Sequence, residues 1–216
     1  MKKIAFLGDS ITAGAGAEIE ENRYTNLLCE KLKCECLNYG ISGTRIAKQF
    51  EPSQEPIYDL DFIDRAKSID KTADLVIVFG GTNDYGHGDA DFGDIESVSQ
   101  YTFFGAVKTL AEYLIDSFGR EKIVFILPLH RFGEENTKGE NGSQKKERPP
   151  LDKYREAIIE ICNFYKLKYY SLNNFFPLPT VSTGDDLTID GLHPNIKGHK
   201  LIADILFQKI CNDNLL

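Results

Sequence analysis

The stretch Ile4-Ala5-Phe6-Leu7-Gly8-Asp9-Ser10 joins a short apolar run to a glycine-containing turn that presents a serine. Two further apolar runs, residues 75–79 and 123–127, also end at turn-forming residues, Gly80-Gly81 and Pro128. All three runs are hydrophobic at every position, and the two later ones are rich in β-branched side chains. Parallel strands have this composition because both faces of their sheet are buried. The three runs therefore predict buried parallel strands.

Amphipathic segments alternate with these runs. We predict helices over residues 24–32, 97–118, 151–165 and 196–210, and weaker strands over residues 35–39 and 168–172. In the second helix, Val107, Leu110, Ala111 and Leu114 share one face at helical spacing. Strands that alternate with helices favour βαβ units, with helices on both faces of the sheet. We therefore predict an α/β fold, a three-layer α/β/α sandwich with a five-stranded parallel sheet, of the flavodoxin-like type.

One stretch departs from this alternating pattern. Residues 131–150 are charged and contain several glycines, and they are longer than the usual connection between two elements. We interpret them as a polar insertion, either a mobile segment near a site or a solvated loop. The chain has no internal repeat, and its length suits one domain. We therefore expect a single domain over residues 1–216.

The composition excludes several classes of protein. Hydrophobic residues make up 42% and charged residues 27% of the chain, as in ordinary globular proteins and unlike collagen, a disordered tail or a membrane bundle. The formal net charge of −8 gives a surface that repels phosphate backbones and anionic lipid. We therefore expect no nucleic-acid partner and no membrane insertion, while the charge says nothing about the number of subunits.

The N-terminal residues and the cysteines favour a reducing compartment. The apolar run between Lys3 and Asp9 is too short for a secretory signal, and no segment approaches the ~18 apolar residues of a membrane span. The five cysteines are odd in number and lack the paired C-x-x-C spacing of a zinc site. We expect a cytoplasmic protein with free thiols and no metal.

Groups suited to catalysis follow the predicted strands. In chain order they are Gly8-Asp9-Ser10, Gly40 with Gly43, Asn83-Asp84 after two glycines, and Asp190 with His193 in the irregular segment before the last helix. Ligands of an open parallel sheet bind beyond the carboxyl ends of its strands. A serine, backbone N–H groups beside glycines, an asparagine amide and an Asp/His pair are the parts that acyl transfer requires.

In identity, chain order and position, these four groups resemble the motifs of the SGNH hydrolases, also called the GDSL family of esterases and lipases. The resemblance covers nearly the whole chain and implies the same three-layer fold. It implies that Ser10 is the nucleophile, that His193 is the general base, and that Asp190 orients the imidazole. It also implies an oxyanion hole made by the backbone N–H groups of Ser10 and Gly43 and by the side-chain amide of Asn83. No cofactor is implied.

The same residues also have structural interpretations. Ser10 and Asp9 are favoured helix caps, Asn83-Asp84 is typical of an Asx turn, and His193 could lie in a surface loop. Four further residues are candidates for the lining of the pocket, namely Asp9, Tyr85, His87 and His130. His199 falls within a predicted helix, where we expect a packed or surface residue.

These observations predict a serine esterase that forms an acyl-enzyme intermediate. The substrate we favour is a small acyl or O-acetyl ester, such as an acetylated carbohydrate. Thioester or lysophospholipid hydrolysis is the alternative within the family, and a non-catalytic nucleotide-, flavin- or carbohydrate-binding module is the alternative of another class. Gly14-Ala15-Gly16 suits a nucleotide loop, but Ile19 stands where G-x-G-x-x-G requires its third glycine.

Overall fold

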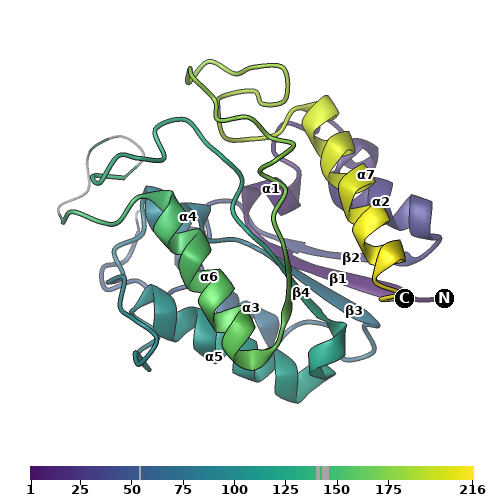
Figure 1. Cartoon of the computed structure of the whole chain (residues 1–216), viewed down its shortest axis with the longest axis horizontal. Helices are drawn as coiled ribbons and strands as arrows, with labels where there is room; N and C mark the ends of the chain where they lie inside the picture. The colour runs from purple at the N-terminus through teal and green to yellow at the C-terminus, as the bar shows by residue number, and fades with distance from the viewer. Residues whose placement is uncertain (54, 140–141, 143–145) are drawn as a thin grey trace.

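The computed structural model describes residues 1–53, 55–139, 142 and 146–216. A sheet of five parallel strands, in the order β2-β1-β3-β4-β5, forms its centre (Figure 1). The strands are β1 (Lys3–Gly8), β2 (Glu35–Gly40), β3 (Leu75–Phe79), β4 (Ile123–Ile126) and β5 (Lys168–Tyr170). Each predicted strand is present, and the predicted fold class is confirmed.

Seven α-helices accompany the sheet in the described ranges. They are α1 (Ser10–Ala13), α2 (Tyr24–Leu32), α3 (Phe62–Ala66), α4 (Thr82–Gly86), α5 (Phe103–Phe118), α6 (Leu151–Tyr165) and α7 (Ile196–Asn212). Short 3-10 helices cover Glu20–Asn22, Pro56–Asp59 and Arg120–Lys122. Within these ranges, no helix is long and apolar enough to cross a membrane.

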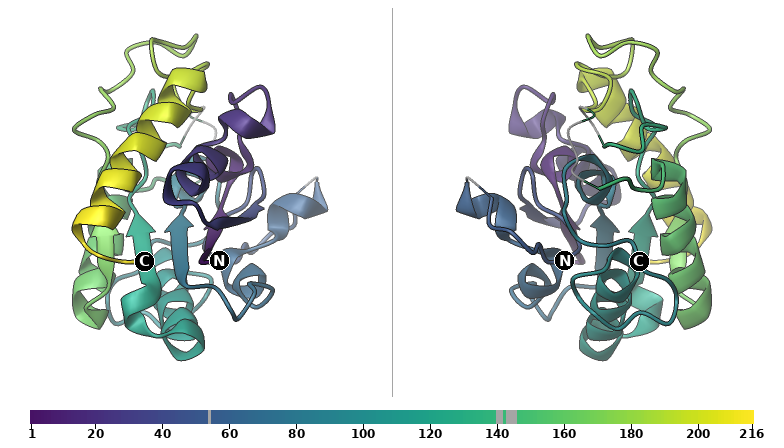
Figure 2. Two further views of the ribbon diagram at one scale, coloured as in Figure 1. Left: turned by 90° about the vertical axis from the view of Figure 1, so that its right-hand side faces the viewer. Right: turned by 90° about the vertical axis from the view of Figure 1, so that its left-hand side faces the viewer.

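The helices form one layer on each face of the sheet (Figures 1 and 2). Alternate residues of β1 show why, because Ala5 and Leu7 pack in the core beneath α3, α5 and α6, whereas Ile4 and Phe6 pack beneath α2 and α7. Every residue from Ile4 to Leu7 is therefore buried, which explains the continuous apolar run in the sequence.

Four helices were predicted, and two of them, α2 and α6, have the expected bounds. Helix α5 begins six residues later than predicted, at Phe103, because the Thr102 side chain caps it by accepting the N–H of Gly105 at 3.2 Å. Helices α3 and α4 were not predicted, since five residues are too few to show a helical period.

The described part of the predicted insertion forms hydrogen bonds with α4 and α6. Residues 140–141 and 143–145 lie outside the described residues. Glu134 is buried and accepts from Arg155 Nη2 at 2.7 Å, and the Tyr85 hydroxyl donates to the carbonyl of Gly133 at 2.6 Å. The segment is therefore anchored to α4 through Gly133 and to α6 through Glu134.

The strand order determines where a ligand can bind. The chain passes from β1 to β2 on one side and then crosses to β3 on the other side of β1. Such a reversal opens a crevice at the carboxyl ends of the two strands that flank it. Ser10 follows β1 directly, and Asn83 lies in α4 just beyond β3. The fold thus brings two of the predicted site residues to one crevice.

Candidate active site

Ser10, His193 and Asp190 form a continuous chain of hydrogen bonds. Ser10 Oγ lies 2.9 Å from His193 Nε2, and His193 Nδ1 lies 2.6 Å from Asp190 Oδ2. Ser10 is the first residue of α1, directly after the turn from β1, whereas the other two residues come from the long connection between β5 and α7. The structure therefore brings together residues that are 183 positions apart in the chain.

Asp190 is held as a carboxylate. Partial burial raises its pKa, but hydrogen bonds from the His193 ring and from the backbone N–H groups of His193 and Leu192 outweigh burial and keep the pKa below its usual value. A carboxylate only accepts hydrogen bonds, so His193 Nδ1 carries the ring proton. His193 Nε2 is then the acceptor that faces the Ser10 hydroxyl, which is the arrangement a general base needs.

Three N–H donors border the same cleft as Ser10 Oγ and His193. The cleft has a volume of about 580 Å³, and Ser10, Gly43 and Asn83 all line it. In the described part of the chain, neither the Ser10 nor the Gly43 backbone N–H donates to a protein atom. The Asn83 side-chain amide gives one of its two N–H groups to the carbonyl of Thr44 at 3.0 Å, which leaves the other for a ligand.

Residue 43 has to be glycine for two reasons. Its φ of +75° lies in the left-handed region, and a Cβ atom built there would sit 2.4 Å from Tyr58 Cδ1. The Tyr58 ring thus packs directly on the backbone that carries the Gly43 N–H. A side chain at position 43 would push apart the aromatic ring and the N–H donor.

Asp84 holds the segment that follows Gly43. Its buried carboxyl group accepts the backbone N–H groups of Ile46 at 3.0 Å and Ala47 at 2.9 Å. Burial raises the pKa of Asp84 to about 6, although these two hydrogen bonds act in the opposite direction. Asn83 and Asp84 therefore reach across to the 44–47 segment instead of closing an Asx turn.

Comparison with known families accounts for this arrangement. Residues 6–201 match the family model described as GDSL-like Lipase/Acylhydrolase. The chain belongs to this family. The resemblance inferred from four short motifs is thereby confirmed over most of the chain.

Several solved structures have the same fold as this GDSL-like protein. A protein from Lactobacillus plantarum is 27% identical, with 98% of this chain and 97% of that chain covered and a TM-score of 0.80. A lipase/acylhydrolase from Enterococcus faecalis is 21% identical, with coverage of 98% and 96% and a TM-score of 0.66. A carbohydrate acetylesterase from Sinorhizobium meliloti is 14% identical, with coverage of 98% and 99% and a TM-score of 0.67. The latter two show likeness of fold alone, and no curated protein sequence matches the chain.

The helix-cap interpretation applies to Asp9 in this GDSL-like chain. Asp9 Oδ1 accepts the backbone N–H of Ile11 at 3.0 Å and caps α1, while the Ser10 hydroxyl faces His193. Asp9 is buried, and burial raises its pKa to about 6. Asp9 is not among the residues that line the cleft, so it shapes the turn that presents Ser10.

Of the other three candidate lining residues, His87 lines the cleft and two do not. Tyr85 is fully buried, with its hydroxyl donating to the carbonyls of Gly133 and Asn136. His130 Nδ1 lies 2.8 Å from Glu134 Oε1. Both side chains therefore form hydrogen bonds with the 131–139 segment.

Four lining residues were not singled out from the sequence: Ala15, Ser42, Tyr58 and Leu192. Leu192 and Ser42 stand inside recognised motifs, so their positions could have been inferred from their neighbours. Tyr58 had no such signal. It lies in the 3-10 helix Pro56–Asp59, which is too short to show a period in the sequence, and only the tertiary fold brings it against Gly43.

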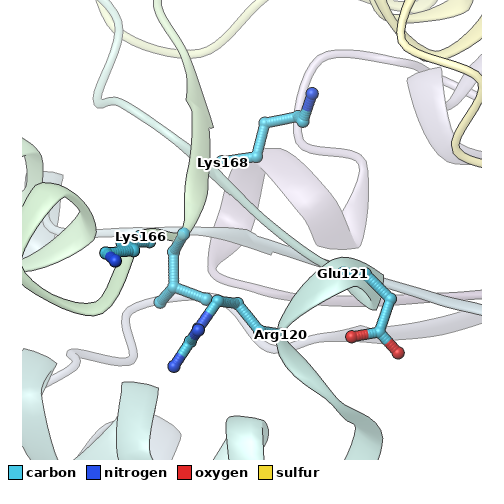
Figure 3. Close-up of a pocket in the computed structure, with 5 residues that line it drawn as sticks. Arg120, Glu121, Lys166 and Lys168 are labelled. Carbon is cyan, nitrogen blue, oxygen red and sulfur yellow. The ribbon is translucent and has the colours of Figure 1, made fainter.

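A second hollow lies at the opposite ends of the strands. It has a volume of about 460 Å³ and is lined by Arg120, Glu121, Lys166, Leu167 and Lys168 (Figure 3). The labelled side chains point in different directions, and the Lys168 ammonium pairs with Asp213 at 2.7 Å. Among the described residues, this hollow shares no lining residue with the cleft of Ser10 and His193 at the carboxyl ends of the strands.

One group of carboxylates in the described part of the chain has the spacing of metal ligands, namely Glu134, Glu135 and Asp152, with one oxygen of each within 4.8 Å of the others. Arg155 already pairs with Glu134 at 2.7 Å and with Asp152 at 2.5 Å. These ion pairs offset the negative charge that a cation would need.

Proposed function

We propose that the chain is a serine esterase that hydrolyses a small carboxylic ester through an acyl-enzyme intermediate. The observation that carries this proposal is the Ser10–His193–Asp190 chain of hydrogen bonds, which opens into a cleft bordered by the Ser10, Gly43 and Asn83 donors. Nucleophile, base, orienting carboxylate and oxyanion donors are the complete set that ester hydrolysis needs.

Acylation begins when Ser10 Oγ attacks the ester carbonyl carbon. The hydroxyl proton passes to His193 Nε2, and Asp190 stabilises the imidazolium across the 2.6 Å contact at Nδ1. Negative charge on the former carbonyl oxygen is met by the N–H groups of Ser10 and Gly43 and by the Asn83 amide. The imidazolium then gives its proton to the leaving alkoxide oxygen as the ester C–O bond breaks.

Deacylation repeats these steps with water. His193 Nε2 takes a proton from a water molecule while the resulting hydroxide attacks the acyl carbon of the Ser10 ester. The tetrahedral intermediate collapses, the bond to Ser10 Oγ breaks, and His193 returns the proton to that oxygen. The products are the carboxylic acid and the free enzyme.

The lining of the cleft supports a compact substrate. Apolar contact is offered by Ala15, Tyr58 and Leu192, and polar contact by Ser42 and His87. A volume of about 580 Å³ suits a small acyl group with part of a polar alcohol. The fold is shared with a protein named a carbohydrate acetylesterase, and we favour an O-acetylated carbohydrate as the substrate class.

The test is hydrolysis of p-nitrophenyl acetate by the wild type, Ser10→Ala and Ser171→Ala, followed by mass spectrometry after a serine-reactive phosphonate. Ser171 is exposed and lies outside the cleft, so its variant controls for the loss of a serine. We expect turnover and one phosphonyl adduct in the wild type and in Ser171→Ala, and neither in Ser10→Ala. Turnover in Ser10→Ala at the wild-type rate would contradict the proposal.

Substrate class is then tested with acetylated xylo-oligosaccharides, longer p-nitrophenyl acyl esters, acetyl-coenzyme A and a lysophospholipid. A kcat/KM that is highest for the acetylated sugar supports the carbohydrate assignment. A preference for the thioester or the lysophospholipid would replace the carbohydrate assignment by the thioesterase or the lysophospholipase alternative.

A further inference from the structure

Arg65, in the last turn of α3, is a buried cation beside the candidate site. Its residue is only 8% exposed. Nη1 donates to Thr44 Oγ1 at 2.6 Å, and Nη2 donates to the carbonyl of Gly8 at 2.8 Å and also to the carbonyl of Tyr39. All three acceptors are neutral oxygens, and no carboxylate of the described residues forms an ion pair with Arg65.

Burial of a charged guanidinium among neutral oxygens is energetically unfavourable. Burial lowers the pKa of Arg65 to about 10, even though the charges of Asp9 and Asp61 act in the opposite direction. Apolar residues of similar volume commonly stabilise a buried position as well as a charged group does. Packing alone, including the Phe62 ring 4.9 Å from the guanidinium, therefore does not account for an arginine here.

The acceptors of Arg65 lie in the two segments that carry the Ser10 and Gly43 donors. Gly8 ends β1 and stands two residues before Ser10, and Tyr39 lies near the end of β2, which leads into the Gly40–Gly43 turn. Thr44 directly follows Gly43, and its own carbonyl accepts the Asn83 amide at 3.0 Å. One guanidinium thus connects the segments that carry the Ser10 and Gly43 donors, and it reaches the Asn83 donor through Thr44.

We propose that Arg65 is a positioning residue, which sets the relative placement of the Ser10, Gly43 and Asn83 donors around the oxyanion. The inference rests on the proposed esterase function, because it assigns Arg65 a part in that reaction. Arg65 touches no reacting atom in this scheme. It acts through Gly8, Tyr39 and Thr44, which it holds at fixed separations.

The planar fork of arginine suits this task. Two nitrogens in one rigid plane can hold three acceptors at set distances, whereas a lysine ammonium is a single point on a flexible stem. Misplacement of catalytic groups by about 1 Å lowers rates about 10²-fold, and loss of one oxyanion donor lowers kcat about 10²–10³-fold. The contacts of the three donors with the oxyanion strengthen in the transition state, so their misplacement affects kcat more than KM.

The experiment compares Arg65→Lys and Arg65→Met with the matched control Arg155→Lys. Arg155 is also a buried arginine, 5% exposed, and its Nε donates to the carbonyl of Pro128 at 2.8 Å, but it contacts none of the three donors. With p-nitrophenyl acetate, we expect kcat to fall about 10-fold to 100-fold in Arg65→Lys and further in Arg65→Met, with KM changed less than about threefold. Arg155→Lys lowers the Tm but keeps the wild-type kcat at temperatures where it is folded.

A second measurement does not depend on turnover. The NMR signals of the Gly43 backbone amide and the Asn83 side-chain amide should shift in Arg65→Lys and remain in place in Arg155→Lys. If the wild type shows no turnover, the proposed function fails while this measurement still tests the positioning of the donors. The positioning role is overturned if Arg65→Lys keeps wild-type kcat and unshifted amide signals, or if neither Arg65 variant folds, since Arg65 would then be required for folding alone.

Discussion

The two halves of the candidate site are held together in different ways. The donor half consists of Ser10, Gly43 and Asn83, and the proton-transfer half consists of Asp190 and His193. The donor half is held by its neighbour Asp84, which is 3% exposed and accepts from backbone N–H groups 37 and 38 residues away in the chain. In the proton-transfer half, the Asp190 side chain is 43% exposed and bonds to groups two and three residues away.

The proton-transfer half is thus a local motif, whereas the donor half depends on tertiary contacts. The D-x-x-H segment forms its own turn, because residues three apart can meet without help from the rest of the fold. The donor half exists only when the ends of β1, β2 and β3 come together. Substitutions in the proton-transfer half should therefore affect the chemistry alone, whereas substitutions in the donor half should affect both chemistry and stability.

The largest effect is expected for His193→Ala. A general base typically contributes about 10²–10⁴-fold, and this one serves both acylation and deacylation, so we expect kcat to fall toward the upper end of that range. The Tm should stay close to that of the wild type, because, among the described residues, all hydrogen-bond partners of His193 other than Ser10 lie within four residues of it in the chain. Thermal unfolding and p-nitrophenyl acetate kinetics test both statements, with His130→Ala as a control outside the cleft. A Tm lowered by many degrees would contradict the comparison.

Asn83→Ala should combine both kinds of effect. Loss of one oxyanion donor is expected to lower kcat about 10²–10³-fold with little change in KM. The buried carbonyl of Thr44 also loses its donor, which costs about 1–3 kcal/mol of stability. Steady-state kinetics and urea unfolding measure the two effects, and Asn83→Asp removes the same donor with less change in volume. A change confined to KM would exclude the donor role.

Asp84→Asn should act mainly on stability. An asparagine can accept only one of the two backbone N–H groups, and the unmatched one costs about 1–3 kcal/mol. Burial raises the pKa of Asp84 to about 6 from 3.8, so its contribution to stability is complete below about pH 4 and is lost as the pH rises through about 6. The stability difference between wild type and variant should therefore narrow over that range in urea unfolding. A difference that widens instead would show that the carboxyl group is ionised more easily in the fold.

The smallest effect is expected for His199→Phe, in α7. His199 Nε2 donates to the carbonyl of Ala15 at 3.0 Å, and Nδ1 accepts the backbone N–H of Tyr24 at 3.3 Å. Burial lowers the pKa of His199 below its usual 6.5, so its contribution is present above that pH and is lost as the pH falls below it. We expect a loss of about 1 kcal/mol at pH 8 and a smaller loss at pH 5 in urea unfolding. An equal loss at both pH values would show that His199 does not titrate with folding.

Much of this protein is determined by its sequence alone. Buried strands need apolar side chains on both faces, so their positions appear directly as apolar runs. The Ser10 turn and the Asp190–His193 turn are local, and their residue types indicate the proposed chemistry before any fold is known. The long helices are equally visible, because sixteen residues of α5 repeat the helical period several times.

Other features depend on the tertiary structure. Tyr58 packs on Gly43, Asp84 holds the 44–47 segment, and Arg65 joins the ends of β1 and β2 to Thr44, yet none of these contacts leaves a periodic or local signal. Tyr85 and His130 follow strand ends as lining residues would, but the packed 131–139 segment engages them instead. The sequence by itself determines which chemical groups are present and which local turns carry them. Their placement around one cleft is decided by contacts between distant residues, whose energies depend on distance in space and not on position in the chain.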